Sequence, residues 1–111
     1  MAVDAHFEVR LAVEAEADLA AIADHLAEYA SPNIADAWLE KFLETIASLE
    51  RFPDRGSMPK ELDGAPFRGY RQLHLRPYRI IYRTEGKTVL VAVIVDGRRD
   101  LKSLLHQRLL R

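Results

Sequence analysis

Apolar side chains in the first half of the chain follow two different spacings. Over residues 7–13 they alternate with more polar ones, which predicts a half-buried strand. They then recur every three or four residues, which predicts two amphipathic helices with apolar stripes at Ala15, Leu19, Ile22, Leu26 and Tyr29, and at Ala35, Leu39, Phe42, Ile46 and Leu49. Ser31 and Pro32 separate the helices, because serine caps free N–H groups and proline suits the first helical position. The second helix should end near Phe52, since Pro53 disfavours helical geometry in the residue before it.

The second half of the chain predicts a loop followed by three strands. Prolines and glycines between residues 53 and 68 indicate an ordered loop. Strands follow at residues 70–75, 78–83 and 88–95. The last of these is nearly all apolar, so we expect it at the centre of the sheet, covered on both faces. A short helix should close the chain, with Asp100 as its cap and an apolar stripe at Leu101, Leu104, Leu105 and Leu109.

The order of these elements indicates the fold class. Two helices grouped beside a meander of strands indicate an α+β fold rather than an alternating α/β fold. The expected order is an N-terminal strand, a helical hairpin, a three-stranded antiparallel meander and a short C-terminal helix. The chain has 111 residues, no internal repeat and no low-complexity tract, so we expect a single domain over residues 1–111.

Composition changes this picture only by exclusion. Apolar residues make up 49% of the chain and charged residues 30%, which is ordinary for a soluble globular protein. No apolar run approaches the roughly 20 residues that cross a bilayer, and the N-terminus lacks the pattern of a signal peptide. There is no cysteine, which excludes disulfides and thiol chemistry, and the four histidines lack ligand-like spacing. We therefore expect a cytoplasmic protein with no metal, no cofactor and no membrane contact.

The charge is distributed unevenly along the chain. Residues 67–111 contain eleven Lys or Arg and three Asp or Glu, a net charge of +8. Residues 1–66 carry a net charge of −9, which leaves −1 for the whole chain. Such an asymmetry favours a polyanion or an acidic partner at the basic end.

Several short motifs, in this order and spacing, resemble one known family. The chain resembles the RelE/ParE superfamily of toxins from bacterial type II toxin–antitoxin pairs. The resemblance covers nearly the whole chain. The motifs that carry it are Ala15-Glu16-Ala17-Asp18-Leu19, Phe52-Pro53-Asp54-Arg55-Gly56, Gly69-Tyr70-Arg71, Tyr78-Arg79-Ile80-Ile81-Tyr82 and Gly97-Arg98-Arg99-Asp100.

The RelE branch of this superfamily implies an endoribonuclease that cuts mRNA on the ribosome. Its chemistry is metal-free: a 2′-hydroxyl attacks the neighbouring phosphate while basic side chains stabilise the developing charge. Arg71, Arg79 and Arg99 match basic positions of that branch, so they are the candidate catalytic residues. The position of its proton-transfer group, usually tyrosine or histidine, falls on Leu105. His74 and His106 are of the right residue type for proton transfer but lie at other positions.

The ParE branch implies a non-enzymatic inhibitor of DNA gyrase, and we favour it. Members often carry a His-Gly-Arg-Arg-Asp sequence after the last strand, of which Gly97-Arg98-Arg99-Asp100 is kept and the histidine is replaced by Asp96. The resemblance also implies a cognate, ParD-like antitoxin. Two alternatives remain: a RelE-like enzyme with the ribosome as target, and a decayed toxin that retains only antitoxin binding.

Six residues are candidates for contact with the target or the antitoxin: Arg71, Arg79, Arg98, Arg99, Trp38 and Tyr82. Each also has a purely structural interpretation. Arg79 can pair with a helix carboxylate such as Asp18, and Arg99 can pair with Asp96 or Asp100. Trp38 can belong to the core, and Tyr82 can pack across strands. If the binding interpretation holds, Arg98 and Arg99 should share one surface with Arg71 or Arg79.

Overall fold

The computed structural model describes residues 6–62 and 64–110. Its strands form one four-stranded sheet in the order β1-β4-β3-β2, with β1 parallel to β4 and the other neighbours antiparallel. The predicted α+β order is confirmed. The elements are β1 (Glu8–Leu11), α1 (Val13–Tyr29), α2 (Pro32–Ala47), the 3₁₀ turns η1 (Ser48–Glu50) and η2 (Ala65–Phe67), β2 (Tyr70–Leu75), β3 (Tyr78–Glu85), β4 (Thr88–Asp96) and α3 (Leu101–Leu109).

The helical hairpin begins and turns where its sequence signals lie. Ser31 accepts a hydrogen bond from the Ile34 amide at 3.1 Å, and Pro32 is the first residue of α2, as predicted. Val13 belongs to α1 rather than to the strand, because the Ala12 carbonyl already accepts the first helical bond from Glu16. The α-helical part of α2 ends earlier than expected, and η1 carries the chain on towards Phe52.

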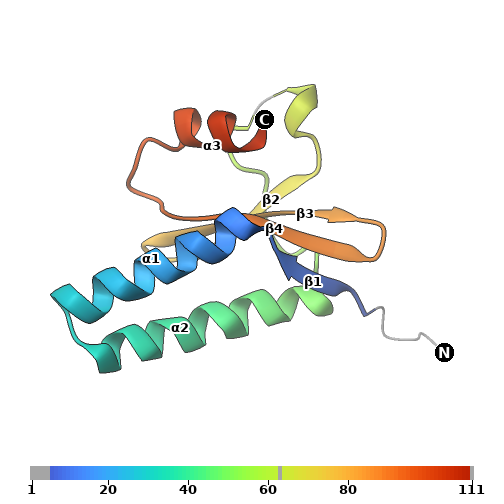
Figure 1. Cartoon of the computed structure of the whole chain (residues 1–111). Helices are drawn as coiled ribbons and strands as arrows, with labels where there is room; N and C mark the ends of the chain where they lie inside the picture. Colours follow the sequence, from blue (N-terminus) through green and yellow to red (C-terminus); the bar gives the residue numbers. More distant parts are fainter. Residues whose placement is uncertain (1–5, 63, 111) are drawn as a thin grey trace.

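Each face of the sheet is covered by a different layer. In Figure 1, α1 and α2 lie together on one side of the sheet and α3 lies on the other. The hairpin side contains one buried cluster and the α3 side contains the other, so β4 is central and buried on both faces, as predicted. The largest fully buried side chains are Tyr82, Phe42, Leu49, Ile80, Ile81 and Leu105.

One edge of β4 is closed by side chains rather than by a strand. β1 pairs with β4 only up to Leu11 and Val91, and an irregularity in the β3–β4 register lies just beyond that point. There the carboxylate of Asp18 accepts a hydrogen bond from the Ile94 amide at 3.0 Å. Arg108 of α3 donates to the Ala92 carbonyl at 3.0 Å and forms an ion pair with Asp18. A buried backbone group without a hydrogen-bond partner is costly, and these two side chains supply partners for the Ile94 amide and the Ala92 carbonyl. Their ion pair also links α3 to α1 at this point.

Candidate functional site

The arginines of the two neighbouring strands point to opposite faces of the sheet. Arg71 lies opposite Tyr82 in the β2–β3 register, on the face that the hairpin covers. Arg79 lies opposite His74, on the α3 face. A clamp in which Arg71 and Arg79 hold one phosphate is therefore not formed. Of the surface expected for Arg98 and Arg99 with Arg71 or Arg79, the structure brings together Arg98 and Arg79, which line one hollow.

Arg71 holds the loop that follows η1. Its guanidinium donates to the carbonyl oxygen of Gly56 at 2.7 Å and to that of Asp54 at 3.3 Å. Gly56 is required there, since an added Cβ atom would lie 2.5 Å from the Gln72 carbonyl oxygen and 2.7 Å from the Tyr82 hydroxyl. Arg71 thus has a structural task on the edge strand, and its contact with a partner stays a prediction.

Arg79 is held by an internal carboxylate. Its Nη1 and Nη2 atoms donate to the two carboxylate oxygens of Glu61 at 2.9 Å and 2.8 Å, and its Nε donates to Gln72 Oε1 at 2.6 Å. Only 11% of the Arg79 side chain and 26% of the Glu61 side chain are exposed. Hydrogen bonding from Arg79 lowers the pKa of Glu61, so the carboxylate stays charged. The expected partner Asp18 is wrong, because it is occupied by Arg108.

The turn after β4 presents its arginines to solvent. Gly97, Arg98 and Arg99, here called the basic turn, connect Asp96 to α3. The Gly97 amide donates to the Pro77 carbonyl at 2.7 Å. An added Cβ at Gly97 would lie 2.9 Å from Arg79 Cδ, so glycine lets the Arg79 stem pass.

The pairing inside the basic turn differs from the expected one. Arg98, not Arg99, binds Asp96, with its Nη2 2.6 Å from the carboxylate and its side chain 77% exposed. Hydrogen bonds from Arg98 lower the pKa of Asp96 to about 2. The side chain of Arg99 is exposed and forms no hydrogen bond or ion pair with any residue in the described part of the chain. Asp100 occupies the N-cap position of α3 but makes no side-chain cap bond, and it accepts one from Ser103 instead.

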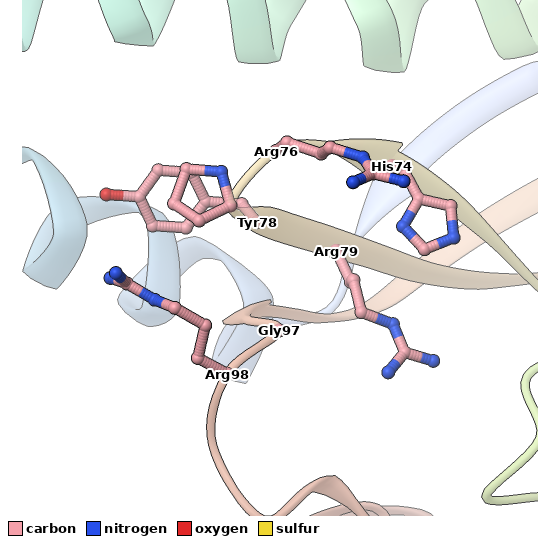
Figure 2. A pocket seen from close by; sticks show the side chains of 7 residues that line it. His74, Arg76, Tyr78, Arg79, Gly97 and Arg98 are labelled. Atoms are coloured by element: carbon pink, nitrogen blue, oxygen red, sulfur yellow. The ribbon is translucent and has the colours of Figure 1, made fainter.

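A basic hollow of about 590 Å³ opens at this end of the sheet. Figure 2 shows the residues that line it, from the adjoining ends of β2 and β3, the turn between them and the basic turn: His74, Arg76, Pro77, Tyr78, Arg79, Gly97 and Arg98. The guanidinium groups of Arg79 and Arg98 point away from each other (Figure 2). Of the three arginines that line the hollow, Arg79 is paired with Glu61 and Arg98 with Asp96, while Arg76 is exposed at the rim.

A second opening lies between the basic turn and the helical hairpin. It measures about 310 Å³ and is lined by Ala21, Ile22, His25, Tyr78, Asp96 and Arg99. We call it the hairpin cleft. It combines apolar groups with the exposed guanidinium of Arg99, and Arg99 therefore faces α1 rather than Arg79.

The two aromatic candidates belong mainly to the core. Tyr82 is completely buried; its hydroxyl donates to the Pro53 carbonyl at 2.7 Å and accepts from the Gly56 amide at 3.0 Å. Burial raises its pKa, and its predicted contact with a partner is wrong because no atom is accessible. Trp38 is half-buried and meets Tyr78 edge-on, with ring centroids 5.3 Å apart. Its contact with a partner stays a prediction.

Comparison with known proteins decides the family. The family model described as ParE toxin of type II toxin–antitoxin system, parDE, matches residues 9–101. The chain belongs to the ParE toxin family. Toxin ParE3 of Caulobacter vibrioides is 28% identical over 76 residues, which cover 68% of this chain and 72% of that protein.

Solved structures agree with this assignment. A chain of the chromosomal ParDE system from P. aeruginosa is 26% identical and has a TM-score of 0.70, covering 82% of this chain and 96% of that one. A chain of the RelBE2 toxin–antitoxin complex from Mycobacterium tuberculosis is 24% identical with a TM-score of 0.55, covering 82% and 98%. The second match shows the common fold alone. The chain is thus a type II toxin of the RelE/ParE superfamily.

Within this ParE family member, the residues that a RelE-like nuclease would use are not assembled. Leu105 is completely buried in the core beneath α3, as its apolar stripe predicted. The His106 ring packs against Phe67 at a tilt of 58°, with ring centroids 4.7 Å apart, and His74 lies exposed beside Arg79. No group of three or more His, Asp or Glu in the described residues has the geometry to hold a metal ion. Nor does the described part of the chain contain a helix long and apolar enough to cross a membrane.

Two residues that form ion pairs in this region, Glu61 and Arg108, were not identified from the sequence. Glu61 lies in an irregular loop, where no periodicity indicates which strand it meets. Arg108 was not singled out in the sequence, and it is bound to Asp18 ninety positions away. The sequence offered one weak signal for each: Glu61 precedes the apolar Leu62 in its loop, and Arg108 precedes Leu109 of the apolar stripe.

Proposed function

We propose that this chain inhibits DNA gyrase in the cytoplasm and is neutralised by a cognate ParD-like antitoxin. Family membership over residues 9–101 supports the ParE branch. The observation that carries the choice against a nuclease is Leu105. A proton-transfer group contributes roughly 10²–10⁴-fold to rate, and here its position is held by a completely buried aliphatic side chain.

The arrangement of the arginines supports the same choice. A phosphate clamp needs cationic groups that converge on one point. Arg71 and Arg79 lie on opposite faces of the sheet, and Arg99 is turned towards the hairpin cleft. The proposed activity is therefore occlusion of a protein surface on gyrase, with no chemical step in the toxin.

Expression of the chain without an antitoxin in bacterial cells tests the proposal. A gyrase inhibitor should cause filamentation with an SOS response, because stalled gyrase leads to broken DNA. An arrest of translation without that response would support the ribosome-dependent nuclease instead. Normal growth at a confirmed level of folded protein would support a decayed toxin that retains only antitoxin binding.

We further propose that the antitoxin contacts the hairpin cleft. Arg99 supplies an exposed cation without an ion-pair partner in the described residues, and Ala21 and Ile22 supply apolar surface beside it. An acidic amphipathic segment fits this combination, with its apolar groups in the cleft and its carboxylates at the rim. The basic turn then gives the complex a salt-dependent rate of association.

A pair of arginine variants tests this contact. Arg99→Ala should slow association with the cognate antitoxin by about fivefold at low salt, because a rim charge acts mainly on the encounter rate. Arg10→Ala is the matched control: Arg10 is similarly exposed but lies on β1 and pairs with Glu8. Equal association rates for the two variants in stopped-flow experiments would remove the hairpin cleft from the proposed interface.

A further inference from the structure

The Arg79–Glu61 pair lies between two openings rather than inside a closed core. Arg79 and His74 line both the basic hollow and a smaller hollow of about 280 Å³. The smaller hollow is completed by Lys60, Glu61 and Gln72. Arg79 is therefore reachable from both hollows, and Glu61 from the smaller one.

The geometry around Arg79 is that of an occupied anion site. The guanidinium fork presents two parallel N–H groups, and both oxygens of Glu61 accept from them at 2.8 Å and 2.9 Å. Carboxylate and phosphate oxygens fit this fork equally well. Gln72 Oε1 accepts from Nε and also from Nη2, one of the two groups that bind Glu61, so Gln72 and Glu61 orient the guanidinium together and Gln72 is a remaining partner in a variant that lacks the Glu61 charge.

Glu61 is attached to the site through a loop and not through the sheet. It lies in the irregular segment between the Ser57–Gln72 bridge and η2. The buried side chains of Pro59 and Leu62 hold this segment on either side of it. The Glu61 side chain is 26% exposed, so water reaches the ion pair.

We propose that Arg79, with His74 and Lys60 beside it, is an oxyanion-binding site, and that Glu61 is its internal occupant. An external phosphate or carboxylate group binds there only when the Glu61 carboxylate is withdrawn. This inference is independent of the cellular target, since it concerns the free chain. Arg79 then has the capacity to bind an external oxyanion, which is blocked while Glu61 is bound to it.

Inorganic phosphate is the probe for the test, and the Arg79 Nε–Hε NMR resonance is the readout. In Glu61→Gln, phosphate at constant ionic strength should shift this resonance saturably, with a dissociation constant in the millimolar range. The affinity should exceed that of the wild type by about tenfold or more, because phosphate no longer competes with charge-assisted hydrogen bonds. Acetate in place of phosphate shows whether a carboxylate alone suffices. Glu85→Gln is the matched control, since it removes the carboxylate paired with Arg83 at the other end of β3.

A second variant keeps the test decisive. Glu61→Asp retains the charge but shortens the side chain, and it should give an affinity between those of the wild type and Glu61→Gln. Equal responses of the wild type and both variants would overturn the proposal, whether all bind or none does. If neither variant folds, Glu61 is an indispensable structural partner and not a removable occupant, which contradicts the proposal as directly.

Discussion

Arg79 and Arg99 lie at the same end of the sheet but in opposite electrostatic situations. Arg79 is 11% exposed and held by a carboxylate and an amide, while Arg99 is exposed and has no side-chain partner in the described residues. Both contribute equally to the net charge of residues 67–111. The number of cations in a segment therefore does not tell how many can bind a partner, because an internal carboxylate can already occupy the guanidinium, as Glu61 does for Arg79.

The largest effect should come from removing the held arginine. Arg79→Met should lower the free energy of unfolding by about 3 kcal/mol, because it leaves the partly buried carboxylate of Glu61 without a partner. Urea denaturation followed by circular dichroism measures the loss. Arg99→Met is the matched control and should change stability by no more than about 0.5 kcal/mol. Similar decreases in the free energy of unfolding for the two variants would show that the ion pair of Arg79 does not stabilise the fold.

A smaller loss should follow when the edge of β4 is opened. Arg108→Met removes the bonds to Asp18 and to the Ala92 carbonyl, so α3 loses its attachment to α1. We expect a decrease of about 2 kcal/mol in the free energy of unfolding, less than the roughly 3–5 kcal/mol of a broken buried pair, because Asp18 keeps its hydrogen bond from the Ile94 amide. Hydrogen exchange of the Ile94 amide should accelerate more than that of amides at the β2–β3 turn. Unchanged exchange at Ile94 would show that Asp18 protects it without help from α3.

The smallest effect belongs to the exposed pair of the basic turn and appears only in acid. The pKa of Asp96 is lowered to about 2 in the folded chain by hydrogen bonds from Arg98. A carboxyl group with a lowered folded pKa stabilises the fold above its ordinary pKa of 3.8, and this contribution is lost as the pH falls towards about 2. Arg98→Ala should raise the Asp96 pKa and flatten the pH dependence of stability between pH 4 and 2. NMR titration of the Asp96 side-chain carbon measures the shift, and an unchanged midpoint would mean that Arg98 is not its cause.

The sequence predicted the fold well because the fold follows from local periodicity. Residues 70–75 form β2 as predicted, and the apolar run after residue 88 is the central strand. Ser31 and Pro32 mark the hairpin turn through bonds within a few residues. The residues that determine each of these elements lie within a short stretch of chain, so the local pattern of residues is enough to predict the element.

The partners of Arg79 and Arg108 could not be predicted because they depend on contacts far apart in sequence. The alternation within β3 places Arg79 on one face, but only the path of the loop brings Glu61 onto it from 18 positions away. Asp18 was available to Arg79 in principle and instead meets Arg108 from the far end of the chain. Leu105 was the exception, since its burial followed from the apolar stripe of its own helix.

The proposed binding of gyrase, without cleavage of RNA, is tested most directly by one paired measurement. Purified protein is added to a DNA gyrase supercoiling reaction and, in parallel, to ribosomes programmed with mRNA. We predict inhibition of supercoiling at a protein concentration that leaves the mRNA intact. Codon-positioned cleavage of ribosome-bound mRNA with unaffected supercoiling would contradict the account.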